Sequence, residues 1–184
     1  ARFAEVRDGA IDFAGVRLPL RPMVGVIATA PDGEPIGTAY VGRHGGNLDC
    51  NLIAAGATVH LPVRVPGALF YVGDVHATMG DGEVSGSGFE IAARVTLRLV
   101  LEKGAATEWP WLETADTIAT LASAERFDDA AEAAVRAMIP RIMARHGVSE
   151  TDAYMLASIR GDLRVNQACR SPIDTSVRFE FPKL

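Results

Sequence analysis

Short apolar runs separated by turn residues fill the first 104 residues of the chain. Runs of this kind, bounded by Gly, Pro, Asn and Asp, predict β-strands. The dipeptide Asp8-Gly9 lies between two of them and predicts a hairpin at the beginning of the sequence. Further strands are expected in residues 23–30, 58–63 and 68–77.

The clearest alternation of apolar and polar side chains lies in residues 95–101. Apolar residues occupy every second position, although one intervening position is also apolar. A period of two sends alternate side chains to opposite faces, so this segment is predicted to be a half-buried strand. The apolar row is Val95, Leu97, Leu99 and Leu101; its neighbours are Thr96, Arg98, the apolar exception Val100, and Glu102.

After residues 109–113 the apolar spacing changes to a helical one. Apolar side chains three or four residues apart predict a long helix near Phe127, with Asp128 or Asp129 as its cap. Pro140 lies inside this helix and is expected to kink or shift it, because proline lacks a backbone donor.

A second, shorter helix and two closing strands are predicted in the rest of the chain. Ser149 can cap the helix with Asp152 three residues later, and Gly161 ends it. Residues 163–170 and 175–181 return to strand patterning. The sequence therefore predicts an α+β fold: a β-rich sheet or sandwich core, two helices late in the chain, and closing strands that rejoin the early sheet.

Composition narrows the class of protein. The chain has 184 residues, 48% of them hydrophobic, so we expect one compact unit with a β-rich part (residues 1–104) and a helical part with closing strands (residues 105–184). The net charge of −5 and the lack of a basic run argue against a nucleic-acid partner. The chain has neither an apolar run of about 20 residues nor an apolar signal core, so we expect no membrane partner and a cytoplasmic location.

Two Gly-rich loops hold most of the residue types suited to catalysis or metal binding. Asp74 and His76 are two residues apart in a predicted strand, so both side chains leave the same face and can share a divalent cation. Glu83 follows a tight turn that returns it toward that strand, where a carboxylate could act as general base on a water. Taken singly, such residues are more often a turn cap, a half-buried histidine and a solvated turn residue.

The first loop, residues 42–50, contains His44, Asn47 and Asp49. The spacing alone does not show that His44 and Asp49 converge. The Asn47 amide could donate to a carbonyl oxygen in an oxyanion-type role, or Asn47 could simply occupy a left-handed turn. Two such loops in one chain, each pairing His with Asp in a glycine-rich frame, indicate a site.

Other reactive residues have ordinary alternatives. Cys50 and Cys169 lie far apart in the sequence, so no disulfide framework is expected. Cys50 could be a nucleophile supported by a histidine, although a small buried hydrophobic residue is the more usual role. His60 and His146 are expected to pack or to cap.

Longer runs around these loops carry a family resemblance, and residues 73–90 are the most specific of them. The runs are residues 18–31, 42–50, 61–99 and 109–114 and, more weakly, 155–170. In them the chain resembles the acetamidase/formamidase family of short-chain amide hydrolases.

The resemblance implies hydrolysis of a small linear amide, such as formamide or acetamide, to a carboxylate and ammonia by metal-activated water. It also implies a β-rich homo-oligomer with a divalent metal, for which zinc is preferred to calcium. Asp49, Asp74 and His76 match the positions expected to bind the metal, with His44 as a further candidate. Glu83 would then be the catalytic base, and Asn47 a donor to the substrate carbonyl.

Members of this family are longer than this chain and have a further β-rich region before the part that corresponds to Ala1. The chain is therefore expected to represent the carboxyl-terminal portion of an amidase, which forms a homo-oligomer or pairs with an amino-terminal half chain. The alternative is a non-catalytic β-rich subunit, or a fragment that needs the missing half for activity. A third possibility is an amidase that uses Cys50 as its nucleophile.

Overall fold

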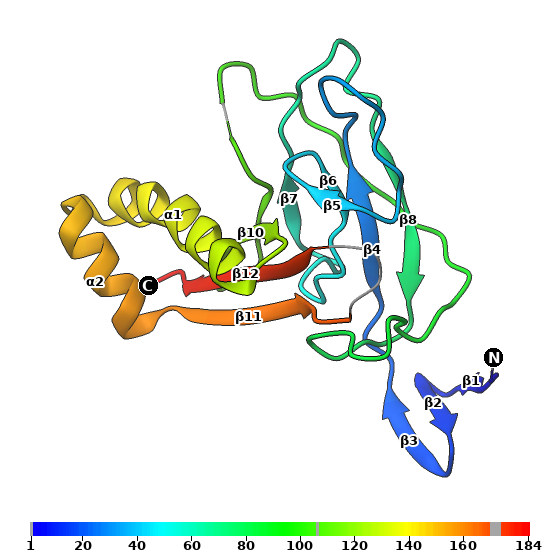
Figure 1. Ribbon diagram of the computed structural model, residues 1–184. Helices are drawn as coiled ribbons and strands as arrows, with labels where there is room; N and C mark the ends of the chain where they lie inside the picture. The colour runs from blue at the N-terminus through cyan, green and yellow to red at the C-terminus, as the bar shows by residue number, and fades with distance from the viewer. Residues whose placement is uncertain (1, 106, 170–173) are drawn as a thin grey trace.

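The computed structural model describes residues 2–105, 107–169 and 174–184. A three-stranded antiparallel sheet, which we call the arm, opens the chain and projects from the body of the molecule (Figure 1). Asp8 and Gly9, with φ of 49° and 70°, form the predicted hairpin turn. The strands of the arm are β1 (Glu5–Arg7), β2 (Ala10–Phe13) and β3 (Val16–Pro19).

A four-stranded antiparallel sheet in the order β5-β6-β4-β8 carries the candidate loops. Met23 lies opposite His76, and Ala28 lies opposite Tyr71. The end of β8 that bears His76 therefore lies beside the start of β4. The strands are β4 (Met23–Ala28), β5 (Val41–Gly42), β6 (Gly45–Asn47) and β8 (Tyr71–His76).

A five-stranded antiparallel sheet has the order β11-β12-β10-β9-β7. The late strands thus share a sheet with β7 from the early part of the chain, as the sequence predicts. One predicted closing strand ends at Arg170, which lies outside the described residues. The strands are β7 (Thr58–His60), β9 (Trp111–Glu113), β10 (Thr117–Ala124), β11 (Asp162–Gln167) and β12 (Thr175–Pro182).

The first helix, α1 (Phe127–His146), is continuous through Pro140. Its N-cap is Arg126, whose backbone is extended, so the predicted cap at Asp128 or Asp129 is wrong. The two aspartates lie in the first turn instead, where their negative charge stabilises the positive end of the helix dipole.

The second helix, α2 (Glu150–Arg160), begins where the sequence predicts. The hydroxyl of Ser149 accepts a hydrogen bond from the backbone N–H of Asp152 at 3.1 Å. This bond satisfies one of the free donors of the first helical turn. Gly161 follows as the C-cap.

Two apolar cores hold these layers together. The first packs both helices against the five-stranded sheet, with Met138 and Phe181 among its fully buried side chains. The second joins the two larger sheets, since Ile27 of β4 and Leu121 of β10 belong to it. The β-rich α+β fold predicted from the sequence is confirmed.

One strand prediction is wrong. Residues 95–101 form no strand, and Leu97, Leu99 and Leu101 are 45%, 68% and 65% exposed. The alternation is present in the sequence, but no described strand pairs with this segment.

Among the described residues, no helix combines the length and the apolar character needed to cross a membrane.

Candidate active site

Asp74 and His76 lie on β8, and Gly25 of β4 lies beside them. The register places Gly73 and Val75 opposite Val26 and Val24, so Asp74 faces Gly25. A Cβ atom on Gly25 would lie 2.6 Å from Oδ2 of Asp74 and 2.5 Å from Oδ1 of Asp49. Gly25 therefore leaves the space in which two carboxylates meet above the sheet.

Asp49 reaches this place from the loop that follows β6. Its backbone N–H donates to the carbonyl of Gly25 at 3.2 Å, and its side chain is only 1% exposed. Asp49, Asp74 and Glu83 have φ of 40°, 55° and 38°, in the left-handed region that residues with a Cβ seldom adopt. Such backbone strain is concentrated at functional sites, where the surrounding structure enforces it.

Asp49, Asp74 and His76 form what we call the Asp–His cluster. One ligand atom from each lies within 4.8 Å of the others. Nε2 of His76 is 3.3 Å from Oδ1 of Asp74, and its Nδ1 is 3.9 Å from Oδ1 of Asp49. Gly88 packs so closely on the imidazole that a Cβ there would lie 2.5 Å from Nδ1.

Charges within the cluster shift its pKa values. Burial raises the pKa of Asp49 to about 7, and the neighbouring carboxylates of Glu83 and Asp74 add to this effect. Burial lowers the pKa of His76, but the hydrogen bond to Asp74 and the nearby carboxylates outweigh it and raise the pKa to about 9. The same hydrogen bond lowers the pKa of Asp74. The site therefore favours a positive charge among its carboxylates.

Glu90 is an additional carboxylate that the sequence did not single out as a site residue. Its Oε1 lies 3.2 Å from Nε2 of His76, and the two residues form an isolated β-bridge. Partial burial raises the pKa of Glu90, although 57% of its side chain is exposed. Only its place within the specific run of residues 73–90 hints at a role.

Gln167 of β11 connects the Asp–His cluster to Glu83. Its buried side-chain amide donates to Oδ2 of Asp49 and, at 3.3 Å, to Oε2 of Glu83. Glu83 is itself buried, with 8% exposure. The described contacts link Glu83 to Asp49 through the amide of Gln167, a residue 84 positions later in the chain than Glu83, and do not place it against β8. Sequence reasoning missed Gln167 because nothing local relates it to either loop.

A buried arginine fixes the turn that carries Glu83. Arg178 of β12 donates from both terminal nitrogens to the carboxylate of Asp81, at 2.8 and 2.9 Å. Its remaining donors reach Glu180 and Asn166. A bidentate pair of this kind sets orientation as well as position. The five-stranded sheet thus holds both the turn and the amide that define the place of Glu83.

The cluster fits a divalent cation. Oδ1 of Asp49 and Nδ1 of His76 are buried and have no hydrogen-bond partner among the described residues. Buried polar atoms are otherwise nearly always paired. Two unpaired atoms that can each offer a lone pair to a metal, 3.9 Å apart, therefore suit a cation between them. Two carboxylates and an imidazole form a donor set that zinc accepts.

The other two predicted site residues lie elsewhere. His44 occupies the turn between β5 and β6, and its carbonyl accepts from Thr29, four residues beyond Gly25 and hence about 13 Å along the strand. Asn47 pairs with Val26, so its side chain leaves the sheet on the face opposite that of Gly25. The described contacts bring neither residue to the Asp–His cluster.

The remaining reactive residues are packed. Cys50 is fully buried, and burial raises the pKa of its thiol to about 11, which disfavours the thiolate that a nucleophile needs. His60 stacks on Trp111 with ring centres 3.7 Å apart, and His146 meets Phe181 edge to face. The expectation that both histidines pack is confirmed.

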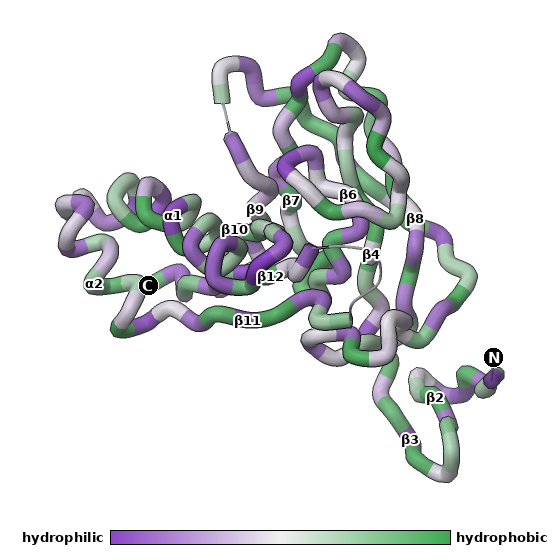
Figure 2. The backbone as a smooth tube through the Cα atoms, viewed as in Figure 1, coloured by the Kyte–Doolittle hydropathy of each residue, from purple (hydrophilic) through white to green (hydrophobic). Residues whose placement is uncertain are grey.

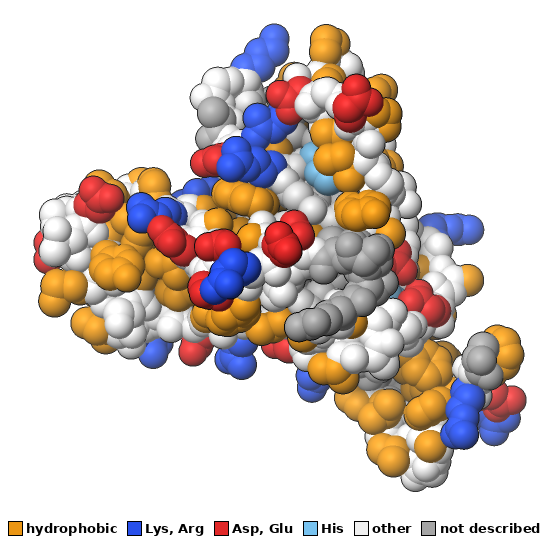
Figure 3. All heavy atoms as spheres, in the orientation of Figure 1, with side chains coloured by type: hydrophobic (Ala, Val, Ile, Leu, Met, Phe, Trp, Pro, Cys, Tyr) orange, Lys and Arg blue, Asp and Glu red, His pale blue; other side chains and the backbone are white. Residues whose placement is uncertain are grey.

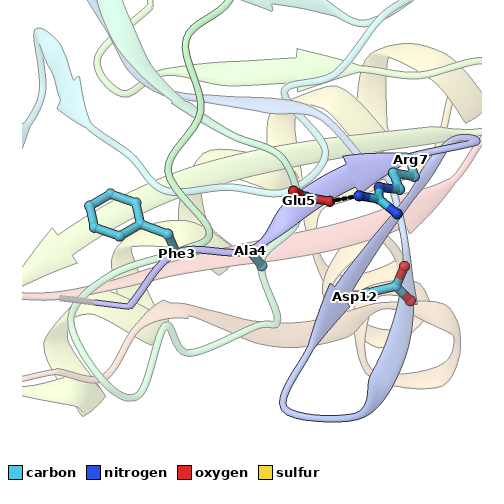
Figure 4. Close-up of a pocket in the computed structure, with 5 residues that line it drawn as sticks. All are labelled: Phe3, Ala4, Glu5, Arg7 and Asp12. Carbon is cyan, nitrogen blue, oxygen red and sulfur yellow. Dashed lines mark ion pairs between the residues drawn. The ribbon is translucent and has the colours of Figure 1, made fainter.

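Two hollows lie away from the cluster. One, of about 360 Å³, is on the arm, where Glu5 and Arg7 form an ion pair (Figure 4). The other, of about 460 Å³, lies between Trp109 and Arg141 of α1. No cluster residue lines either hollow, so they do not provide its substrate pocket.

Comparisons with known proteins cover the part of the chain that contains these residues. The model of the Acetamidase/Formamidase family matches residues 33–177, which include every member of the cluster as well as Glu83 and Gln167. An acetamidase from Bacillus halodurans has a crystal structure that superposes with a TM-score of 0.88 at 43% identity, over 96% of this chain and 59% of that one.

Two further crystal structures are equally similar. A predicted acetamidase/formamidase from Thermoanaerobacter tengcongensis gives a TM-score of 0.91 at 41% identity, over 97% of this chain and 59% of that chain. An acetamidase from Yersinia enterocolitica gives 0.92 at 32% identity, over 99% of this chain and 55% of that chain. This chain thus spans less than two thirds of the length of each.

Proposed function

Since this chain belongs to the acetamidase/formamidase family, we propose that it carries the catalytic residues of an amide hydrolase. The substrate is a small linear amide such as formamide or acetamide, and the products are a carboxylate and ammonium. The observation that supports this proposal most directly is the Gln167 amide, which joins Asp49 of the Asp–His cluster to the carboxylate of Glu83.

Asp49, Asp74 and His76 would hold a divalent cation. Zinc is preferred to calcium, because calcium requires six to eight oxygen ligands and the cluster includes an imidazole. When bound, the cation would polarise the amide carbonyl and lower the pKa of a bound water. The strained backbone of Asp49 and Asp74 and the space left by Gly25 position the ligands before binding.

Glu83 is the proposed general base. Gln167 holds its Oε2, and the carboxylate would accept a proton from the attacking water. The carboxylate then delivers this proton to the amide nitrogen as the carbon–nitrogen bond breaks. Without protonation the nitrogen would leave as an amide anion, a very poor leaving group. The water oxygen becomes part of the carboxylate, and the nitrogen departs as ammonia, which takes up a further proton in solution.

The first test removes the base alone. Glu83→Gln should lower kcat/KM for ammonia release from formamide and acetamide by about 10²- to 10⁴-fold, because the amide cannot accept the proton. Zinc content, measured by mass spectrometry, and the thermal unfolding midpoint should stay close to those of the parent protein. The exposed Glu125 provides a matched control, and Glu125→Gln should leave all three measurements unchanged.

The second test concerns the metal and does not depend on activity. Asp49→Asn should weaken zinc binding by at least about 100-fold, because it removes an anionic ligand. Zinc binding that survives this change would exclude the proposed ligand set. Full amide turnover by Glu83→Gln would exclude Glu83 as the base, and turnover abolished by thiol alkylation alone would favour Cys50.

A further inference from the structure

Residues 92–101, which we call the unpaired segment, belong to no strand or helix. No backbone hydrogen bond among the described residues involves them, and all of them are exposed. In Figure 1 this segment is part of the green trace that links β8 to β9 and carries no arrow. Its odd-numbered positions are all apolar, with Ala93 and Val95 followed by Leu97, Leu99 and Leu101.

Such a segment is unfavourable in water. A row of leucine and valine exposes apolar surface, and removing such surface from water is favourable. Free edges of β-rich chain pair readily with other polypeptide, and proteins normally protect them with charge, proline or a cover. The apolar row here contains no charge and no proline, because Arg94 and Arg98 occupy even-numbered positions between its members.

The comparisons point to a source for a covering strand. The Bacillus, Thermoanaerobacter and Yersinia proteins match nearly all of this chain, yet the match accounts for only 59%, 59% and 55% of their own lengths. Each of these relatives therefore has a large further region of polypeptide. The arm points to the same need, because Phe3, Val6 and Val16 are 96%, 42% and 55% exposed and hydrophobic side chains gather on it (Figure 3).

We propose that the unpaired segment is a docking strand, occupied by a β-strand from the polypeptide region that these relatives have outside the match. Backbone hydrogen bonds would hold the incoming strand, and pockets for alternate apolar side chains would set its register. The row of Leu97, Leu99 and Leu101 faces that region's core, and acidic side chains of the partner lie opposite Arg94 and Arg98.

Docking would also act on the Asp–His cluster. The unpaired segment continues directly from Glu90, which contacts His76, and from Ile91, whose N–H donates to the carbonyl of Val75 at 3.1 Å. A strand paired with residues 92–101 therefore fixes Glu90 against His76. This consequence rests on the proposed amidase function, whereas the docking itself does not.

The test uses the region of the Bacillus halodurans acetamidase outside the match, produced as a separate polypeptide, as the probe. Hydrogen–deuterium exchange of residues 92–101 is measured for the whole chain alone and with the probe. We expect exchange to slow by at least about tenfold on mixing, because the amides become hydrogen-bonded. Leu97→Asp should weaken probe binding by at least about 30-fold, whereas Thr96→Asp, one position away on the other face, should change it by less than about threefold.

The outcomes separate the possibilities. Equal effects of the two aspartate variants, or no protection by the probe, would overturn the docking strand. Protection that appears in the chain alone and grows with its concentration would also overturn it, in favour of a second copy of this chain. Protection by the probe without ammonia release from formamide would leave the docking strand standing and count against the proposed function.

Discussion

Two segments of this chain share one alternating pattern and have opposite fates. In β12, Val177, Phe179 and Phe181 are 0%, 6% and 1% exposed, and the strand pairs with β10 on one side and β11 on the other. In the unpaired segment, an equally regular apolar row lies open to solvent. Figure 2 shows hydrophobic stretches both in the paired strands and in the arm that projects from them. Alternation encodes the ability to pair, and the neighbouring strands decide whether pairing occurs.

The Asp–His cluster is connected to both kinds of region, the packed sheet and the unpaired segment. Its residues come from the four-stranded sheet and its loops, but Gln167 and Arg178, which contact Glu83 and its turn, come from the packed five-stranded sheet. Glu90, by contrast, leads into the unpaired segment. One side of the site is therefore held by a packed sheet, and the other leads into a segment that pairs with no described strand.

The sharpest way to break this comparison is to truncate one apolar residue in each segment. Phe181→Ala should lower the free energy of unfolding by about 3–5 kcal/mol, because it leaves a cavity between the helices and the sheet. Leu99→Ala should change it by less than about 0.5 kcal/mol, since Leu99 is exposed. Urea denaturation of both variants measures the difference. Similar losses would mean that the segment is packed in the isolated chain.

The contact by which the five-stranded sheet supports the Glu83 turn can be removed by mutation. Arg178→Met should lower the free energy of unfolding by about 2–3 kcal/mol. This is less than the loss of a fully buried ion pair, because Asp81 is 34% exposed and can regain some water. Arg136→Met provides the matched control: it removes an exposed pair with Glu132 and should leave the denaturation midpoint unchanged. A Glu83 turn that keeps its protection against hydrogen exchange in Arg178→Met would contradict this role.

The space between the carboxylates of Asp49 and Asp74 can be filled from the four-stranded sheet. Gly25→Ala should destabilise the chain by about 1–3 kcal/mol and weaken zinc binding, because the new Cβ meets the carboxylates of Asp49 and Asp74. Gly73 on β8 is the matched control, since nothing lies within 4 Å of a Cβ there. Gly73→Ala should be neutral in thermal unfolding and in zinc titration. Equal zinc affinity in both variants would rule out the Asp–His cluster as the metal site.

A last expected effect is a dependence of zinc affinity on pH. His76, with a pKa of about 9 in the metal-free protein, must lose its proton to become a ligand, so affinity should rise about tenfold per pH unit between pH 7 and pH 9. Below pH 7 the slope should steepen, because Asp49, with a pKa of about 7, must also lose a proton. Competition with a chromophoric chelator measures this slope. A flat profile would show that neither proton is displaced.

The predictions that succeeded rest on local rules. Ser149 caps α2 because its hydroxyl reaches an N–H three residues later, and Asp8-Gly9 turns because both residues tolerate positive φ. The pairing of Asp74 with His76 on β8 followed from the strand period alone.

The sequence by itself therefore determined the β-rich class, the helices, most strands and the residue types of the site. Only the tertiary structure decided that Gln167 meets Asp49 118 positions earlier, that Asn47 and His44 lie elsewhere, and that residues 95–101 lack a partner. The physical reason is the range of the forces involved. Turns, caps and periodicity act over a few residues, whereas the pairing of strands and the meeting of buried polar groups depend on which distant segments the apolar cores bring together.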